Sequence, residues 1–363
     1  MSNKTFKTAG RNIRLPFFFP DATRAVIKTL DSEDIKNTKT PGILVNTYHL
    51  WRELGPNVIK KFGGIRAFMN WDGAVISDSG GFQVMSLVKK DKGAGKVTDE
   101  GVVFYPAKNK KLVLTPEESI CFQMSLKPDM VVVLDDFTDP KANRKEASES
   151  VERTINWAAR SKCEFEKICK KQKLSKKNRP YLLGVVQGGK FQDLRAQCTK
   201  GLVEIGFDGL GYGGWPINED KSFDYLSAKT IIDNAPKNYF FYGLGIGKPE
   251  DIIGCVNLGF DIFDCVLPTR DARHARLYIF NADSISKINL KKKKFYSYFV
   301  PNKEKYLGDT SPVSTACDCL LCRKYSRGYL AHLFRTETVS AMRLATIHNL
   351  RFYSLLMGKL GKI

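Results

Sequence analysis

Three acidic side chains stand where runs of apolar residues end, and such positions suit a carboxylate that does chemistry. Asp78 follows the run 74–76, Asp135 follows 130–134, and Asp264 lies within 260–267. A buried carboxylate is costly unless it is paired or used, which makes these acids candidates for proton transfer or nucleophilic attack. The alternative for Asp264 is a purely structural role at a strand end. Its neighbour Cys265 is a rival candidate for the nucleophile. Adjacent strand residues point to opposite faces, so only one of these two can face a site.

The segment that begins at Asp78 holds more than a turn requires. It reads Asp78-Ser79-Gly80-Gly81-Phe82-Gln83, and it places a carboxylate, a flexible backbone and a flat aromatic ring side by side. A plain turn explains the two glycines but not the acid and the ring beside them. We therefore treat this segment as part of a candidate site.

A second group of reactive residues lies near the C-terminus. Cys317, Cys319 and Cys322 are followed by His348, with the spacing C-x-C-x2-C-x25-H. Three thiolates and one imidazole complete the closed tetrahedral shell of a structural zinc ion. The alternative is three incidental thiols, but this density in a chain without a signal segment favours a metal. His332 is the competing fourth ligand, although we expect it to pack or hydrogen-bond within its own segment.

The acids belong to a series of eight short apolar runs. These runs cover residues 15–19, 43–47, 74–78, 130–135, 181–187, 209–213, 239–245 and 262–267. Stretches with helical signals lie between them, such as Thr115-Pro116 and Lys248-Pro249, each of which precedes an apolar segment. Nearly continuous apolar strands that alternate with helices indicate a parallel sheet covered on both faces, and eight units predict an α/β fold, a (β/α)8 TIM barrel. A doubly wound sheet is the alternative.

Polar residues gather at the C-terminal ends of these runs. In a barrel all of these ends meet at one mouth, so we expect Asp78, Asp135 and Asp264 to converge there. After residue 290 the pattern changes, through a Lys-rich segment, to the cysteine group and a helical tail. We predict a catalytic barrel with insertions over residues 1–290. A zinc-binding subdomain near the C-terminus, with helices that close the barrel, is predicted over 291–363.

The charge of the chain points to a polyanionic partner. The 363 residues include 58 Lys and Arg against 38 Asp and Glu, which gives a formal net charge of +20 and a pI of about 9.5. Such an excess attracts nucleic acid through phosphate contacts, although lysine-rich solvated faces explain it equally well. Neither a signal segment nor an apolar stretch long enough to cross a membrane is found in the sequence, so we expect a cytoplasmic enzyme.

Five motifs in order along the chain resemble those of the tRNA-guanine transglycosylase family, in its bacterial form. They are 78–83, 184–189 (Gly-Val-Val-Gln-Gly-Gly), 245–251 (Gly-Ile-Gly-Lys-Pro-Glu-Asp), 263–270 (Phe-Asp-Cys-Val-Leu-Pro-Thr-Arg) and the cysteine and histidine group. The resemblance covers nearly the whole chain, from Asn46 to His348. It implies an enzyme that exchanges guanine at the wobble position of certain tRNA anticodons for a 7-deazaguanine, without external energy.

The resemblance assigns roles to the two carboxylates. Asp264 is implied as the nucleophile that attacks the anomeric carbon of the ribose and forms a covalent tRNA intermediate. Asp78 is implied as the acid and base that protonates the leaving base and deprotonates the incoming one. This division is similar to that of a retaining glycosidase, with a base instead of water as the acceptor.

The resemblance also implies a base pocket of six residues: Phe82, Asp135, Gln187, Gly214, Leu244 and Gly245. Phe82 is expected to stack on the purine, and Asp135 to accept hydrogen bonds from the ring N–H and exocyclic amine of guanine. Gln187 and the Gly214 amide are expected to address the base carbonyl, while the last two residues close the other face. For Asp136, pairing with solvent or lysine and a supporting role behind the pocket are both open.

Five residues are implied on the tRNA side: Lys248, Arg270, Arg273, Asn46 and His49. The planar fork of arginine suits phosphates and flipped bases, so Arg270 and Arg273 are expected to hold the anticodon loop, with Lys248 on the same rim. Asn46 and His49 are expected to line the pocket near the ribose. Buried hydrogen bonding within the barrel is the alternative for both.

One loop departs from the family pattern. Bacterial members carry Gly-Gly-Leu-Ala-Val-Gly-Glu where this chain has Gly-Gly-Trp-Pro-Ile-Asn-Glu at 213–219. The Trp215-Pro216 peptide offers a carbonyl but no N–H, so it can accept from an aminomethyl cation and cannot donate to a nitrile. Together with Phe137 beside Asp135 and the bulk of Ile217, this loop favours 7-aminomethyl-7-deazaguanine over queuine.

The resemblance further implies partners and a cofactor. We expect one structural Zn²⁺ per chain, a tRNA with a uridine-guanine-uridine anticodon stretch, a 7-deazaguanine base, no membrane contact and a homodimer. The alternatives are a relative that uses queuine or modifies DNA, a barrel glycosidase, and a non-catalytic tRNA-binding accessory subunit. The presence of both Asp264 and Asp78 counts against the last of these.

Overall fold

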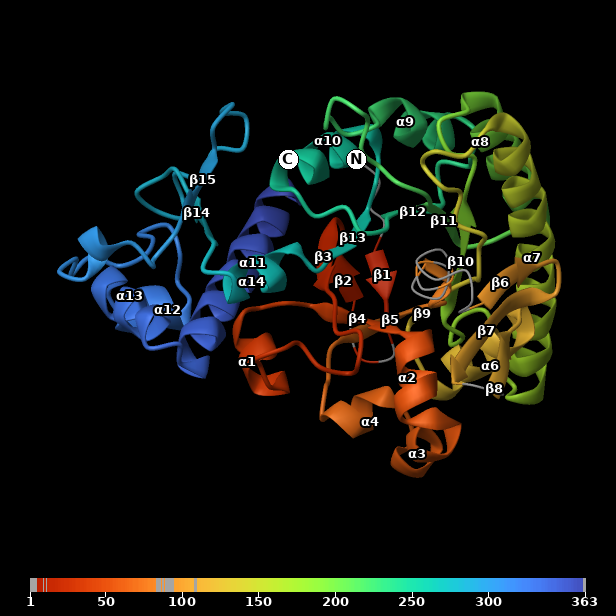
Figure 1. Cartoon of the computed structure of the whole chain (residues 1–363), viewed down its shortest axis with the longest axis horizontal. Coiled ribbons are helices and arrows are strands. Elements are labelled where there is room, and N and C mark those ends of the chain that lie inside the picture. The colour runs from red at the N-terminus through yellow and green to blue at the C-terminus, as the bar shows by residue number, and fades with distance from the viewer. Residues whose placement is uncertain are drawn as a thin grey trace.

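Eight parallel strands form the centre of the molecule (Figure 1). The computed structural model describes residues 5–8, 10, 12–82, 86, 88, 95–107 and 110–361, so Gln83 lies outside the described residues. The strands are β3 (Phe17–Pro20), β4 (Gly42–Asn46), β5 (Ala74–Asp78), β9 (Met130–Val132), β10 (Tyr181–Val186), β11 (Gly209–Tyr212), β12 (Phe240–Gly243) and β13 (Ile262–Cys265). Each one overlaps a predicted apolar run, although β3 ends one residue after its run and β4 begins one residue before its run.

The sheet closes on itself, which decides between the two predicted architectures. The strand order is β3-β13-β12-β11-β10-β9-β5-β4, and a parallel bridge between Asp21 and Leu44 joins its two ends. The Ala22 N–H donates to the Leu44 carbonyl at 2.7 Å within this bridge. The (β/α)8 barrel is confirmed, and the doubly wound alternative is wrong.

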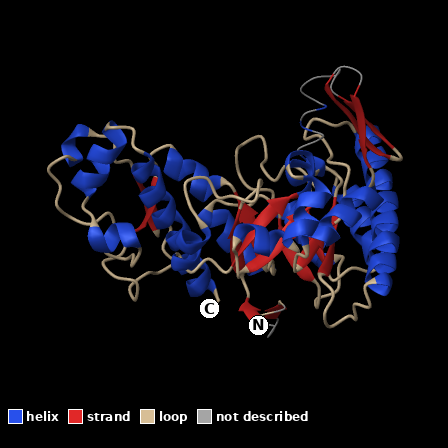
Figure 2. Cartoon of the chain, turned by 90° about the horizontal axis from the view of Figure 1, so that it is seen from below, coloured by secondary structure: helices blue, strands red, loops and turns tan. Residues whose placement is uncertain are grey.

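Helices surround the barrel and continue into the C-terminal part (Figure 2). They are α1 (Ser32–Asn37), α2 (Thr47–Glu53), α3 (Gly55–Phe62), α4 (Ile65–Met69), α6 (Pro116–Leu126), α7 (Arg144–Lys171), α8 (Gln192–Ile205), α9 (Tyr225–Asp233), α10 (Pro249–Leu258), α11 (Leu267–Arg273), α12 (Leu320–Lys324), α13 (Arg327–Arg335) and α14 (Val339–Leu360), with a 3-10 turn at Glu304–Tyr306. The predicted start of α6 is confirmed, because Thr115 and Glu118 form reciprocal capping hydrogen bonds of 3.1 Å.

The barrel lumen is filled by apolar side chains, so a site can form only at an end. Alternate strand residues point inward, and the inward set is Phe17, Phe19, Leu44, Ala74, Ile76, Met130, Val132, Leu183, Val185, Phe240, Tyr242 and Ile262. The hairpin of β1 (Thr5–Lys7) and β2 (Asn12–Arg14) places Phe6 under the barrel, 5.2 Å from Phe17 and 6.0 Å from Phe240 between ring centroids. This hairpin covers the N-terminal end and leaves the C-terminal mouth for chemistry.

Two further small sheets were not predicted from the sequence. The antiparallel strands β6 (Gly95–Thr98), β7 (Gly101–Ala107) and β8 (Lys110–Leu114) form an arm that extends beyond the helices (Figure 2). The strands β14 (Leu277–Phe280) and β15 (Tyr296–Phe299) pair across residue 290. The domain boundary predicted at that residue stays a prediction. Within the described ranges, no helix combines the length and apolar character that a membrane crossing requires.

Candidate active site

A ring of polar side chains lies one inward position above the apolar lumen. In five strands, the residue two positions after the last inward-facing apolar residue is polar. These five residues are Asp21, Asn46, Asp78, Gln187 and Asp264. The parallel registers agree with this placement, because Asp264 is level with inward-facing Phe19 and Asn46 is level with Asp78. For Asp78 and Asp264 the predicted convergence therefore follows from strand alternation, whereas Asp135 lies one residue out of the inward series of Met130 and Val132.

The Asn46 side chain fixes Asp78. Its Oδ1 accepts from the backbone N–H of His49 at 3.3 Å, as the N-cap of α2, and its Nδ2 donates to Asp78 Oδ2 at 2.7 Å. One side chain thus begins a helix and orients a carboxylate. Hydrogen bonding within the barrel, the alternative for Asn46, is present in the structure.

Asp264 faces the mouth and Cys265 does not. Asp264 Oδ1 accepts from the backbone N–H of Gly245 at 2.9 Å, and its residue is only 7% exposed. The Cys265 thiol packs with the outer helical layer near Gly247, and burial raises its pKa to about 12. The rival nucleophile is therefore turned away from the mouth and held as an unreactive thiol.

Burial and mutual repulsion raise the pKa values of the acids in the mouth. Burial is the main cause for all three predicted acids, and it raises the pKa of Asp78 to about 6 and those of Asp264 and Asp135 to about 7. The charge of Asp21 adds to the effect at Asp78 and Asp264. Acids of this kind hold or release protons near neutral pH, as proton transfer requires.

Asp21 is a member of the site that our sequence analysis missed. Its Oδ1 accepts from the Thr23 backbone N–H at 2.7 Å and also from the Thr23 hydroxyl. Burial raises its pKa, while His49 and Arg273 lower it. The alternation of Phe17, Phe19 and Asp21 is the sequence pattern that could have revealed it.

We expect Asp21→Asn to stabilise the protein more at about pH 8 than at about pH 5. An acid whose folded pKa is raised favours folding below its unfolded pKa, and that contribution is lost as pH rises through the folded pKa, here near 6 to 7 for Asp78 and Asp264. Removing the Asp21 charge lowers this repulsion, which changes the free energy of unfolding by about 1.4 kcal/mol for each pKa unit relieved. Denaturant unfolding of both proteins at the two pH values measures the difference.

Asp283→Asn is the matched control, because the Asp283 side chain is 86% exposed. It should leave the pH dependence of stability unchanged. An Asp21→Asn protein whose stability relative to wild type does not depend on pH would show that Asp21 is not coupled to the other acids.

The expected base-recognition residues form a hydrogen-bonded group. The Gln187 Nε2 donates to Asp135 Oδ2 at 2.6 Å, and the Gln187 Oε1 accepts from the Thr138 backbone N–H at 3.1 Å. These bonds orient the amide so that its NH2 group faces Asp135. Asp136 is buried and paired with Arg153 rather than with solvent or lysine, and its supporting role behind the pocket stays a prediction.

Aromatic and apolar residues border the same group. The Phe82 ring is 46% exposed and meets the Phe137 ring edge-on, with 5.0 Å between centroids. Leu244 packs over Gly211, where an added Cβ would lie 2.4 Å from the Leu244 Cδ1. Trp215 is 54% exposed, and the next carbonyl, that of Pro216, accepts from the Asp224 N–H at 2.9 Å.

The predicted tRNA-side residues lie on elements that leave the mouth. Arg270 is exposed on α11, directly after β13, and Arg273 on the same helix donates to the Thr269 carbonyl at 2.9 Å. Lys248 is exposed at the start of α10. Burial lowers the pKa of His49, and in the described part of the chain its buried Nδ1 has no hydrogen-bond partner.

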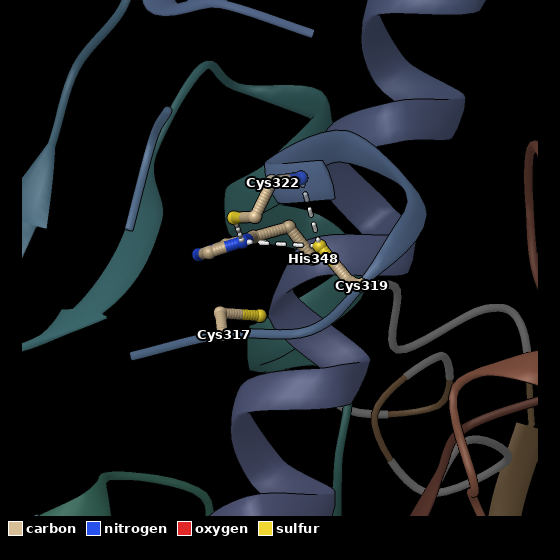
Figure 3. Close-up of side chains that lie close together, drawn as sticks. All are labelled: Cys317, Cys319, Cys322 and His348. Carbon is tan, nitrogen blue, oxygen red and sulfur yellow. Dashed lines mark hydrogen bonds between the residues drawn. The ribbon is translucent and has the colours of Figure 1, made fainter. Parts of the chain in front are cut away.

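The predicted metal ligands come together in the C-terminal part (Figure 3). The ligand atoms of Cys317, Cys319, Cys322 and His348 all lie within 4.8 Å of one another. The His348 Nδ1 is 3.5 Å from Cys319 Sγ and 3.2 Å from Cys322 Sγ, and its Nε2 donates to the Tyr278 carbonyl at 2.8 Å. That last bond sets the tautomer that leaves Nδ1 free to bind a metal.

His332 is not part of this cluster. Its side chain is exposed on α13, so the packing that we expected within its segment is wrong, while hydrogen bonding there stays a prediction. His332 lies on the exposed face of α13, because Leu330, Ala331 and Leu333 occupy the buried positions of that helix. Three thiolates and one imidazole remain as a closed donor set that fits a structural metal ion.

The site and fold agree with what comparison with known proteins shows. The model of the family described as queuine tRNA-ribosyltransferase matches residues 4–362. The chain belongs to this family. Relatives named queuine tRNA-ribosyltransferase from Shewanella sp. strain W3-18-1 and Shewanella putrefaciens strain CN-32 are each 39% identical to it over 346 residues. Each alignment covers 95% of this chain and 85% of the relative, and a Shewanella baltica strain OS155 relative is 38% identical over the same spans.

Membership of the queuine tRNA-ribosyltransferase family confirms the resemblance drawn from the motifs. The chain is an enzyme, a pentosyltransferase that modifies tRNA.

Proposed function

We propose that this enzyme exchanges guanine at the wobble position of tRNAs with a uridine-guanine-uridine anticodon stretch for 7-aminomethyl-7-deazaguanine, in queuosine biosynthesis. The exchange passes through a covalent bond between Asp264 and the ribose. The observation that carries the proposal is the pair of inward-facing carboxylates, Asp264 and Asp78, at the mouth of an apolar barrel. A two-carboxylate site is what a double displacement at an anomeric carbon needs.

In the first half of the exchange, an oxygen of Asp264 forms a bond to the ribose C1′. The bond from C1′ to N9 of guanine breaks, and its electron pair stays with the base. Asp78 gives its proton to the leaving guanine. The Gly245 N–H, 2.9 Å from Asp264 Oδ1, keeps the nucleophile aimed at the mouth.

In the second half, N9 of the incoming base attacks C1′ and breaks the bond to Asp264, while Asp78 takes the proton from that base. Burial raises the pKa of Asp78, which suits a group that gives and then recovers a proton. The Gly245 N–H lowers the pKa of Asp264 against the effect of burial and so favours the ionised form that a nucleophile needs. Asp135 and Gln187 select a guanine-like edge, and Phe82 supplies a stacking face. No external energy is needed, because one glycosidic bond replaces another.

We infer that the Cys3His cluster holds one zinc ion per chain in a structural role. The ion would bind the sulfur atoms of Cys317, Cys319 and Cys322 and the Nδ1 of His348, and it would supply a cross-link rather than a reactive position. On the next residue of α14, the Asn349 Nδ2 donates to the Pro268 carbonyl at 2.9 Å in α11. The metal site would thereby brace the helix that carries Arg270 and Arg273.

The remaining partners follow from the exposed surface. Arg270 and Arg273 on α11 and Lys248 at the start of α10 belong to segments that follow β13 and β12, and their charge suits the anticodon-loop phosphates. A tRNA substrate implies a cytoplasmic location. Tyr325 and Tyr329 are 37% and 46% exposed, and their rings stack with 5.3 Å between centroids. Exposed aromatic side chains of this kind mark an interface, and we place the contact between two copies of a homodimer there.

The function predicts a preference among bases. Labelled guanine should leave a tRNA with the uridine-guanine-uridine stretch, and 7-aminomethyl-7-deazaguanine should enter at least about tenfold more efficiently than the 7-cyano base, since a charge-assisted hydrogen bond to the Trp215 carbonyl contributes about 1.5 kcal/mol or more. Pro216→Ala restores an N–H and should narrow this preference. Competition assays with both bases, for parent and variant, provide the measurement.

The same assay separates the alternatives. Release of guanine from duplex DNA or from free nucleosides, but not from tRNA, would favour a DNA-modifying relative or a glycosidase. Binding of tRNA without exchange would favour an accessory subunit. Equal use of the two bases, or efficient use of queuine, would show that the loop 215–217 does not contact the substituent.

A further inference from the structure

A buried arginine lies directly behind the expected base pocket. Arg195 is on α8, its residue is 1% exposed, and its guanidinium carbon lies 4.7 Å from the centroid of the Tyr212 ring. No carboxylate is found among the hydrogen-bond partners of its guanidinium in the described ranges. Instead the group donates to three backbone carbonyls. They are those of Val186 at 3.2 Å, Gly213 at 3.2 Å and Gly189 at 2.9 Å.

These carbonyls belong to the two loops that carry the pocket residues. Val186 is the last residue of β10, Gly189 lies two residues beyond Gln187 in the loop that follows, and Gly213 precedes Gly214 after β11. An added Cβ on Gly214 would lie 3.4 Å from the Gln187 Oε1 and 3.7 Å from the Arg195 Nη2. Gly214 is therefore close to both the arginine and the recognition group.

The direction of this peptide follows from its geometry. The Gly213 carbonyl and the Gly214 N–H belong to one planar trans peptide, so they point in opposite directions. Since the carbonyl is held by Arg195, the N–H is turned away from it. Gly214 has φ of +87°, a conformation that glycine adopts without strain and that completes this turn.

We propose that Arg195 is a positioning residue that aims the Gly214 N–H at the carbonyl of the bound base and strengthens it as a donor. The inference rests on the proposed function. A carbonyl that accepts from a cation polarises its peptide, and the N–H on the other side becomes a better donor. The leaving guanine takes the electron pair of the glycosidic bond, and part of that charge spreads to its carbonyl oxygen. A donor already aimed at that oxygen stabilises the charge where it develops.

Arginine suits this role and lysine does not. The planar fork reaches two carbonyls with Nη1 and a third with Nη2, so it fixes both loops at once. A lysine keeps the charge but cannot make the same three bonds. A purely structural arginine would also hold the loops, but it would affect every base to the same degree.

The test compares guanine with 6-thioguanine, which has the same ring N–H and exocyclic amine but a weaker acceptor in place of the carbonyl oxygen. Arg195→Lys should lower kcat/KM for exchange of guanine by about 10²-fold or more, the loss seen when one such donor is removed. Exchange of 6-thioguanine should fall by a clearly smaller factor. The preference for guanine should thus shrink, most of all in kcat.

Arg179→Lys is the matched control. Arg179 is a half-buried arginine paired with Asp208, and both residues precede their strands, at the N-terminal ends of β10 and β11. Since the pocket residues lie at the other ends of these strands, substitution of Arg179 should leave the preference for guanine unchanged. Arg195→Ala supplies a second measurement, in which added guanidinium ion, but not urea or sodium ion, should restore part of the guanine exchange.

The outcomes separate the inference from the function on which it rests. A wild-type protein that exchanges no guanine in tRNA overturns the proposed function. If the wild type exchanges guanine but Arg195→Lys loses exchange of both bases by the same factor, the inference alone is overturned. The same holds if the melting curve shows that Arg195→Lys no longer folds. Retained preference together with failure of guanidinium rescue would also assign Arg195 a purely structural role.

Discussion

Asp264→Asn is expected to abolish guanine exchange while the protein stays folded. An amide is nearly the same size as a carboxylate and can still accept from the Gly245 N–H, so the local structure is retained. It cannot act as a nucleophile, and loss of a nucleophile lowers kcat on the order of 10⁴-fold or more. Initial rates of labelled guanine incorporation into tRNA, together with a melting curve, measure both parts of this result.

Cys265→Ala is the control for this variant, because Cys265 is the adjacent rival and packs outward from the barrel. It should keep exchange within a few-fold of wild type, with some loss of stability from the missing buried thiol. Near-normal exchange by Asp264→Asn, or loss of exchange by Cys265→Ala in a folded protein, would move the nucleophile away from Asp264.

Cys319→Ser is expected to lose the metal and to destabilise the whole C-terminal part. Metal binding energy is folding energy in closed sites of this kind, so we expect the free energy of unfolding to fall by more than about 4 kcal/mol. The effect should reach the mouth, since α14 carries both His348 and Asn349, and Asn349 bonds to the Pro268 and Arg276 carbonyls at 2.9 and 3.0 Å. Metal analysis and denaturant unfolding of the purified proteins provide the measurements.

Cys121→Ser is the matched control, because Cys121 is an exposed thiol outside the cluster. It should retain one metal ion per chain and the stability of the wild type. Full metal content and unchanged stability in Cys319→Ser would remove this cluster as the metal site. Bound iron in place of zinc, in the wild type, would keep the ligands and correct the metal.

The barrel could be predicted from the sequence because its strands are buried on both faces. Such strands read as nearly continuous apolar runs, and each run overlaps one observed strand. The predicted acids converge because the ends of parallel strands meet at one mouth. The β6–β8 arm was not predicted, since it stands outside the regular alternation of strand and helix, and the β1–β2 hairpin consists of strands of only three residues.

Two members of the site were not found from the sequence for different physical reasons. Asp21 follows three phenylalanines and a proline. The sequence analysis ended the apolar run at Phe19, but the alternation of inward-facing residues continues for one more position, to Asp21. Arg195 gave no sequence pattern at all. Its partners are backbone carbonyls from two separate loops, and these come together only when the barrel closes.

The side chains that the sequence analysis placed wrongly or left open have surroundings that depend on the fold. His332 is exposed because its helix turns another face toward the interior. For Asp136 the sequence left two roles open, and the partner, Arg153, is 17 residues away on α7. Alternation along a strand places a residue on a face, whereas a partner from a different element is set by tertiary structure.

The most direct test of the account is to locate the bond between the enzyme and its tRNA. Wild-type protein is incubated with a tRNA that carries the uridine-guanine-uridine stretch, without an incoming base, and is denatured rapidly and digested for mass spectrometry. We predict a ribose-linked peptide with the modification on Asp264, a band that survives denaturing electrophoresis, and the loss of both in Asp264→Asn. Linkage to Asp78, Asp21 or Cys265, or exchange of guanine with no trapped adduct at any residue, would contradict the account.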